Sequence, residues 1–322
     1  MGKHIKYGEN MTQRYFDDKK VLVTGGAGFL GKQVVDQIRK IGDPESISIP
    51  RSKDTDLRQW DQCVKAVQKM NVVIHLAANG GGIGYNQAHP GQLFYDNALM
   101  GIQIIQAARL YGAEKMVIIG TVCAYPKYAD VPFSEERLWD GYPEETNAAY
   151  GLAKKMLLVQ SQAYREEFNF NSIYLLPVNL YGPGDDFHPY TSHVIPALIK
   201  KFVDAKNNKN PYVDVWGTGT ASREFLFVED AARGIVLATE KYNKPAPVNL
   251  GSGTEITIKK LAETIQDIVE YDGYIKWDCT KPDGQPRRRL DTSRAKKEFG
   301  FESEVGFKEG LKRTVDWYLE HQ

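Results

Sequence analysis

Lys20-Val-Leu-Val-Thr24 followed by Gly25-Gly-Ala-Gly-Phe-Leu-Gly31 is the stretch of this chain that decides its fold. The first five residues are mostly apolar and β-branched, which is typical of a buried strand, and a helical apolar pattern follows over 33–38. A strand, a glycine loop and a helix in this order predict a dinucleotide-binding turn. We expect the loop to contact a nucleotide cofactor through Gly25, Gly28, Phe29, Leu30 and Gly31. A glycine-rich turn without a ligand is the alternative.

Similar apolar runs alternate with helical patterns over the first half of the chain. Strands are expected at 47–50, 72–78, 115–120 and 171–176, and helices at 97–111 and 149–164. This alternation predicts an α/β fold with a doubly wound parallel sheet, the Rossmann arrangement. We place this dinucleotide-binding domain at 20–183, with 224–252 returning to it, and a smaller interleaved substrate-binding domain mostly at 184–322.

Composition narrows the classes of partner and compartment. Forty-one basic residues balance forty-one acidic ones in 322 residues, so neither a nucleic acid nor a membrane is an expected partner. Cys63, Cys123 and Cys279 lack CxxC spacing, which favours a reducing compartment without disulfides or a metal site. The polar segment 1–20 shows no signal peptide, and no apolar run approaches the roughly 20 residues of a membrane span. We therefore expect a cytoplasmic protein.

The segment after the second expected strand bears on cofactor choice. An acidic residue there usually meets the ribose 2′-hydroxyl of NAD, but this chain has Arg51-Ser52-Lys53. A guanidinium and a hydroxyl suit a 2′-phosphate, so we expect NADP, with NAD as the alternative cofactor and a solvated loop charge as the alternative for Arg51. Asp56 and Leu57 are placed to meet the adenine. His75, inside the third apolar run, is interpreted as a core histidine.

Tyr150 and Lys154 are the candidate acid/base pair. Residues four apart share one face of a helix, so the phenol and the ammonium meet the same space. A tyrosine has a pKa of about 10, and a nearby cation is expected to lower it into a useful range for an alcohol–ketone couple. Chance spacing on an amphipathic helix is the alternative. Thr121 follows the strand expected at 115–120.

The glycine loop, Thr121, Asn97 and the Tyr150/Lys154 pair together resemble the extended short-chain dehydrogenase/reductase superfamily, the NAD-dependent epimerases and dehydratases. The resemblance covers nearly the whole chain. It implies that Thr121, four residues before Tyr125, hydrogen-bonds the substrate oxygen. It also implies cofactor contacts from a further set of residues, namely Ala77, Ala78, Asn97, Tyr150, Lys154, Pro177 and Asn179.

Six downstream segments are similar to one family of that superfamily, the GDP-L-fucose synthases. They are Pro177–Pro183, Phe187–Pro189, Ser192–Pro196, Val215–Gly219, Arg223–Phe225 and Lys281–Gly284. This resemblance implies a GDP-linked 4-keto-6-deoxy-mannose that is epimerised at C3 and C5 and then reduced at C4 with NADPH. One alternative is a sugar-nucleotide epimerase without net redox change, of the GDP-mannose 3,5-epimerase kind or acting on a GDP-heptose. The other is a catalytically silent NADP-binding or scaffold protein.

The same resemblance implies roles for individual side chains. Cys123 matches the base that removes the protons beside the ketone, and His193 the acid that returns them. The substrate would be held by Asn179, His193, Lys201, Trp216, Arg223 and Lys281. The alternatives are a small buried hydrophobe for Cys123 and a surface residue at a helix start for His193.

Association is expected as well. The two long helices carry more apolar residues than one face of a sheet requires, for example Ile102, Ile105, Leu157, Leu158 and Val159. In the superfamily such helices form a four-helix bundle between two copies, so we expect a homodimer.

Overall fold

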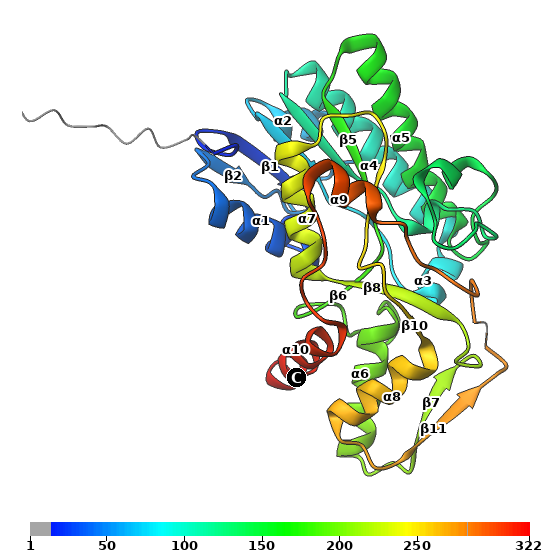
Figure 1. Cartoon of the computed structure of the whole chain (residues 1–322). Helices are drawn as coiled ribbons and strands as arrows, with labels where there is room; N and C mark the ends of the chain where they lie inside the picture. Colours follow the sequence, from blue (N-terminus) through cyan, green and yellow to red (C-terminus); the bar gives the residue numbers. More distant parts are fainter. Residues whose placement is uncertain (1–13, 282) are drawn as a thin grey trace, which may run out of the picture.

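A six-stranded parallel sheet, in the order β2-β1-β3-β4-β5-β9, forms the larger half of the computed structural model (Figure 1). The structure describes residues 14–281 and 283–322; the predictions for residues 1–13 and for Pro282 lie outside the described residues. The strands are β1 Lys20–Thr24, β2 Ser46–Ser48, β3 Val72–His75, β4 Lys115–Ile119, β5 Ser172–Pro177 and β9 Val248–Leu250. The doubly wound parallel sheet predicted from the sequence is therefore confirmed.

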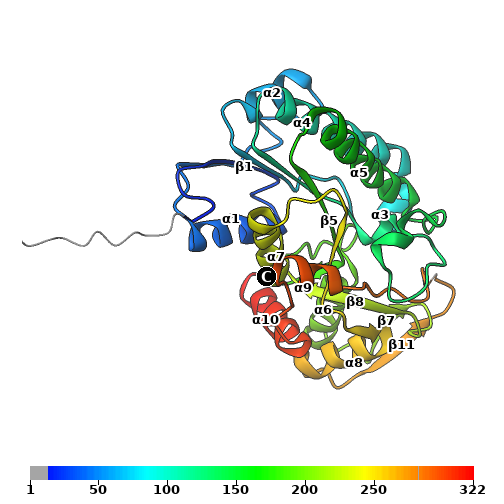
Figure 2. The ribbon, with the colours of Figure 1, turned by 45° about the horizontal axis from the view of Figure 1, so that its top comes forward.

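Helices cover both faces of this sheet (Figures 1 and 2). On one face α1 (Phe29–Ile41) packs with α7 (Val228–Lys241), and on the other α2 (Trp60–Val67) packs with α4 (Pro90–Leu110) and α4 with α5 (Ala148–Phe168). Every residue of β3, β4 and β5 is buried, as near-continuous apolar strands require. The main core lies between the sheet and these two layers.

Helix α4 begins at Pro90, seven residues before the start at 97 expected from the sequence. Proline is tolerated in the first turn because the amide there has no intrahelical partner. Ile105, Leu157 and Leu158, offered above as dimer contacts, are completely buried inside the chain, because they lie on the helix sides that face its own core. Ile102 and Val159 remain 37% and 51% exposed. Further exposed apolar residues on the same two helices are Phe94, Tyr95, Leu110 and Phe168.

The smaller half holds two short sheets and three helices around a second core. One sheet has the order β10-β8-β6 and the other β11-β7. Their strands are β6 Asn179–Tyr181, β7 Tyr212–Trp216, β8 Ser222–Phe227, β10 Glu255–Thr257 and β11 Tyr274–Asp278, and the helices are α6 Val194–Asn207, α8 Ile258–Val269 and α10 Phe307–Glu320.

The two halves interleave along the chain. Strand β6 precedes the boundary expected at 183 but pairs with β8 in a small sheet. Within the segment 224–252, β8 likewise belongs to the small sheet, whereas α7 and β9 belong to the larger half. The connecting elements α3 (Ile83–Ala88), η1 (Val122–Ala124), η2 (Glu135–Trp139) and α9 (Ser293–Phe299) complete the described part. Among the described residues no helix has the length and apolar character to cross a membrane.

Candidate active site

The glycine loop is shaped by close backbone contacts. Gly25 has φ +72°, and a Cβ atom there would lie 2.8 Å from the amide nitrogen of Ala77. A Cβ on Gly31 would lie 2.1 Å from the carbonyl oxygen of Gly25, so only glycine allows α1 to start this near the turn. Gly28 caps α1 without a side-chain hydrogen bond, and its first turn holds no acidic residue. The amides at this helix start therefore fit the pyrophosphate of a dinucleotide.

Arg51 and Ser52 lie in the exposed turn after β2, which ends at Ser48 rather than at the expected residue 50. The carbonyl oxygen of Arg51 accepts hydrogen bonds from the amides of Asp54 and Thr55 at 2.9 and 2.8 Å, which fixes the turn. The Arg51 guanidinium has no hydrogen bond or ion pair to any other described residue. It is therefore available to a phosphate.

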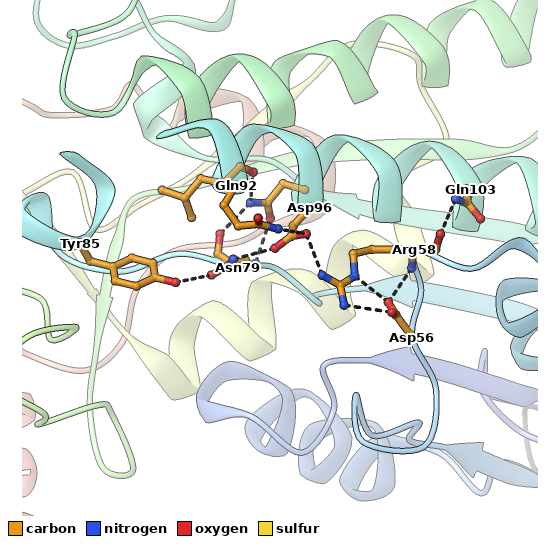
Figure 3. A network of polar contacts seen from close by, with 9 residues as sticks. Asp56, Arg58, Asn79, Tyr85, Gln92, Asp96 and Gln103 are labelled. Atoms are coloured by element: carbon orange, nitrogen blue, oxygen red, sulfur yellow. Dashed lines mark hydrogen bonds and ion pairs between the residues drawn. The ribbon is translucent and has the colours of Figure 1, made fainter. Parts of the chain in front are cut away.

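Polar side chains tie this turn to the loop after β3 (Figure 3). Arg58 donates from Nε and Nη2 to the two carboxylate oxygens of Asp56 at 2.9 and 3.0 Å, and from Nη1 to Asp96 at 3.0 Å. Asp96, on α4, also accepts from Asn79 Nδ2 at 2.9 Å, and Asn79 Oδ1 accepts from the Tyr85 hydroxyl at 3.2 Å. Hydrogen bonds from Arg58 hold the pKa of Asp56 below its usual value. Asp56, expected at the adenine, is thus an ionised anchor of the loop.

The remaining residues expected at the cofactor divide into exposed and enclosed ones. Ala77 lies against Gly25, and Ala78 is exposed beyond the end of β3. Asn97 is buried, and it holds the backbone of Asn79 by accepting from its amide at 3.0 Å and donating to its carbonyl at 2.7 Å. Leu57 and Pro177 are also buried, Leu57 within the main core. Asn97 therefore shapes the loop through contacts inside the chain.

His75 has the surroundings of a core residue. It is 1% exposed, and its Nδ1 lies 2.8 Å from Thr24 Oγ1. Burial lowers its pKa to about 3, with the Lys154 charge adding to the effect. The ring is neutral near neutrality, as expected of a core histidine.

Three of the expected catalytic residues meet where β4 ends. Thr121 caps η1, with Oγ1 accepting from the Cys123 amide at 3.2 Å. Tyr150 lies in the first turn of α5, which packs so closely on η1 that a Cβ on Gly151 would be 2.4 Å from the Cys123 carbonyl oxygen. A Cβ on Gly80 would lie 3.6 Å from Cε2 of Tyr150. The structure thus brings Thr121, Cys123 and Tyr150 together beside the loop that follows β3.

The electrostatics of the Tyr150/Lys154 pair differ from the expectation. Burial raises the pKa of Tyr150, and negative charge at Cys123 adds to this, so the lowering expected from Lys154 is wrong for this structure. Lys154 is itself buried, which lowers its pKa to about 8. The reason is that loss of water disfavours the charged form of both groups. The phenol is consequently held in its protonated form.

His193 caps α6 and is brought toward this cluster by the preceding loop. The Gly82 amide donates to the Thr191 carbonyl at 2.9 Å, and a Cβ on Gly82 would be 2.4 Å from the Ser192 carbonyl oxygen. Although His193 has substantial exposed surface, desolvation lowers its pKa; Asp186 opposes this effect and Arg288 reinforces it. His193 therefore lies within electrostatic reach of Arg288.

Arg223 and Asn179 lie on neighbouring strands of the β10-β8-β6 sheet. Arg223, on β8, donates to the carbonyls of Ser222 and Asp283 at 2.7 and 3.0 Å, and no carboxylate of the described part ion-pairs with it. Burial lowers its pKa to about 10, with Arg288 adding to the effect. Asn179 Nδ2 donates to the Glu224 carbonyl at 3.0 Å. Arg223 thus presents a partly buried cation without a counter-ion.

Trp216 is flanked by two cations. The indole is 53% exposed, and the Nζ atoms of Lys201 and Lys281 lie 5.8 and 5.4 Å from its ring centroid. Lys201 also donates to the Asp214 carbonyl at 2.8 Å. An open aromatic face beside two ammonium groups suits a nucleotide, whose base stacks and whose phosphates are anionic.

Sequence reasoning missed two residues of this cluster, Gln285 and Arg288. Both are buried, and Arg288 Nη1 lies 3.6 Å from Cys123 Sγ. In the sequence Arg288 is one of three consecutive arginines, of which Arg287 is exposed and pairs with Glu255. Only the alternation of exposed and buried positions in an extended segment separates them.

In the described part, no group of three or more His, Cys, Asp or Glu could hold a metal ion.

The chain is similar to known proteins over most of its length. The model of the NAD dependent epimerase/dehydratase family matches residues 21–251. The chain is 38% identical to GDP-L-fucose synthase 1 of Arabidopsis thaliana over 303 residues, 94% of each chain. It is 36% identical to GDP-L-fucose synthase of Escherichia coli K12, covering 94% of this chain and 98% of that one. The crystal structure of a GDP-L-fucose synthetase from Naegleria fowleri bound to NADP superposes with a TM-score of 0.85 at 30% identity, covering 94% and 95% of the two chains.

Proposed function

Because this chain belongs to the NAD dependent epimerase/dehydratase family, we propose that it is an NADP-dependent enzyme that converts GDP-4-keto-6-deoxy-D-mannose into GDP-L-fucose. Relatives named GDP-L-fucose synthase, matched over nearly the full length of both chains, support this choice. The observation that carries the chemistry is the meeting of Thr121, Cys123 and Tyr150 beside the loop after β3. Two reactions follow at one site, epimerisation at C3 and C5 and then reduction at C4.

The cofactor is held by the larger half. The amides at the start of α1 bind the pyrophosphate, and Gly25 and Gly31 let the backbone approach it. Arg51 binds the 2′-phosphate, which favours NADP over NAD, while Tyr150 and Lys154 lie at the nicotinamide end. When bound, NADPH supplies the reducing equivalent for C4.

Epimerisation starts from the acidity of the protons beside the C4 ketone. The Cys123 thiolate takes one of these protons, and the electron pair moves onto the ketone oxygen as an enolate. The Thr121 hydroxyl accepts from the Cys123 amide, so its own hydrogen remains available to the enolate oxygen, as does that of Tyr150. His193 returns a proton to the opposite face of the carbon, which inverts it.

Reduction uses the same oxygen. Tyr150 donates its proton to the C4 oxygen as the carbon is reduced, and the raised pKa of the phenol keeps that proton in place until then. Lys154 then stabilises the phenolate that forms.

The segment 184–322 supplies most substrate contacts. Trp216 stacks on the guanine, with Lys201 and Lys281 beside it. Arg223 pairs with the diphosphate, which supplies the anion that this guanidinium lacks among the described residues, and Asn179 adds a polar contact to the substrate.

The test is to mix the enzyme with NADPH and the keto-sugar nucleotide and to follow the absorbance of the reduced nicotinamide. One NADPH consumed for each GDP-L-fucose formed supports the proposal. Formation of an epimerised keto-sugar without loss of NADPH would establish an epimerase without net redox change instead.

We also propose a homodimer in a reducing, cytoplasmic compartment. Ile102 and Val159 lie among the exposed apolar residues of α4 and α5, which supports a four-helix contact between two copies. All three cysteines are unpaired, which supports the compartment.

A further inference from the structure

We propose that Arg288, fixed by Gln285, is a positioning residue that holds the Cys123 sulfur in place and stabilises it as the thiolate. The inference rests on the proposed function of Cys123 as the base. It assigns to Arg288 a part in epimerisation and none in the reduction step.

The backbone around Arg288 is held by β8. The Arg288 carbonyl accepts from the Glu224 amide at 2.9 Å, and the Pro286 carbonyl accepts from the Ser222 amide at 2.9 Å. Glu224 is completely buried, and its carboxylate accepts from the Leu290 amide at 2.6 Å. The segment therefore runs beside β8 as an added extended stretch, and the position of the guanidinium follows from it.

Gln285 fixes the side chain and also contacts the loop that carries Cys123. Its Oε1 accepts from Arg288 Nε at 3.1 Å, while its Nε2 donates to the carbonyls of Pro126 and Lys127 at 3.3 and 2.8 Å. Gln285 is 4% exposed, so water competes little for these bonds. One amide thus locks the guanidinium onto the segment just after η1, and Nη1 is left to donate to Cys123 Sγ at 3.6 Å.

The charge of Arg288 explains why its contact with Cys123 favours the thiolate. Arg288 is 6% exposed, and no carboxylate of a described residue lies within ion-pair distance of it. A buried cation without an anion is strongly unfavourable, and a thiolate at the end of Nη1 supplies the missing charge. Arg287 is the contrast, because it is exposed and already pairs with Glu255 at 2.5 Å.

Other charged groups also surround the two proton-transfer residues, Cys123 and His193. Cys123 interacts with Tyr150 from α5 and with Arg223 from β8, and among the described residues only Arg288 donates to its sulfur. His193 interacts with Asp186 and with Arg288, and Arg288 contributes to lowering its pKa. One cation therefore favours the charged base and also makes His193 the stronger acid.

The test measures the thiolate directly, without turnover. The rate at which iodoacetamide alkylates Cys123 is followed against pH, with peptide mass spectrometry to separate it from Cys63 and Cys279. Arg288→Met should move the midpoint of this profile upward by about one pH unit or more, which is about tenfold slower alkylation at pH 7. Arg288→Lys, which keeps the charge and guards against a folding defect, should restore most of the rate. Arg287→Met is the matched control and should leave the profile unchanged.

Solvent deuterium entry at C3 and C5 then links the contact to chemistry. In Arg288→Met it should fall about tenfold at pH 7 and recover at higher pH, with reduction of an already epimerised keto-sugar retained. An unmoved alkylation profile together with a raised KM would overturn the proposal, because Arg288 would then bind the substrate phosphates. Failure of the proposed base would give a different result. Cys123→Ser would keep wild-type deuterium entry, while in the protein that retains Cys123 the alkylation profile would still respond to Arg288→Met.

Discussion

Arg51→Ala tests cofactor choice with little disturbance elsewhere. Arg51 is exposed, and its guanidinium has no partner within the described part of the chain. The turn itself is held by the Arg51 carbonyl, which alanine keeps. The substitution should therefore leave the free energy of unfolding nearly unchanged, and any change in affinity would report the lost contact with the cofactor.

The expected magnitude follows from the exposure of the site. A hydrogen bond to a charged group contributes about 1.5–3 kcal/mol, and solvent screening places an exposed pair toward or below the lower end of that range. We therefore expect a loss of about 1–2 kcal/mol in NADP binding, which is roughly a five- to thirtyfold rise in Kd. NAD has no 2′-phosphate, so its affinity should change less than twofold. Raising the salt concentration should narrow the difference between wild type and variant for NADP.

Titration calorimetry of both cofactors measures these affinities, with Lys53→Ala as the neighbouring control. Lys53 is also exposed, and its Nζ lies 3.9 Å from Asp54 Oδ2, so its removal should affect NADP binding less than the removal of Arg51. Equal losses for NADP and NAD in Arg51→Ala would refute the assignment of the guanidinium to the 2′-phosphate. So would an unchanged Kd for NADP.

Three further predictions address catalysis, stability and assembly. Tyr150→Phe should keep NADP affinity but slow reduction at least about a hundredfold, since it lacks the proton donor; stopped-flow absorbance showing more than a tenth of the wild-type rate would contradict this. The folded-state pKa of His75 is depressed to about 3 from 6.5, so the stability it contributes is present above pH 6.5 and is lost as the pH falls below it. Between pH 7.0 and 5.5 the free energy of unfolding, measured by urea titration, should fall by about 1 kcal/mol more in the wild type than in His75→Asn. Equal falls in both proteins would exclude protonation of His75 as the cause. Light scattering at micromolar protein should give a dimer mass for the wild type and a smaller mass for Val159→Glu, whereas a monomeric wild type would remove the proposed interface.

The sequence predicts the larger half of the fold because its signals are local. Each buried strand is a short apolar run, and the glycine loop predicts a strand before it and a helix after it. Helix α4 was expected too short because its first turn, from Pro90 to Phe94, carries no helical periodicity. The sheet of β6, β8 and β10 was not predicted, because its strands lie far apart in the chain and no local sequence signal indicates that they pair.

The candidate site divides in the same way. The positions of Thr121 and Tyr150 could be proposed from the sequence, because Thr121 follows a strand end and Tyr150 shares a helix face with Lys154, whereas the role of Cys123 came from the resemblance to the GDP-L-fucose synthases. The raised pKa of Tyr150 could not be predicted from the sequence, because it depends on how completely α5 and η1 exclude water. Arg288 could not either, since its burial depends on pairing with β8, more than sixty residues earlier in the chain.

The interleaving of the two halves has a consequence for how the site forms. Cys123 lies in η1 and Tyr150 in α5, both in the larger half, whereas Arg223 lies on β8 and Arg288 on the stretch beside it. The two guanidinium groups have no carboxylate partner in residues 14–281 and 283–322, so the smaller half alone would bury cations without anions. The carboxylate of Glu224, on β8, accepts from the amides of Gly253 and Leu290 and so holds the stretch beside this strand. Within the described part of the chain this carboxylate has no contact with the Cys123 sulfur, so we expect its loss to act on Cys123 through the displacement of Arg288.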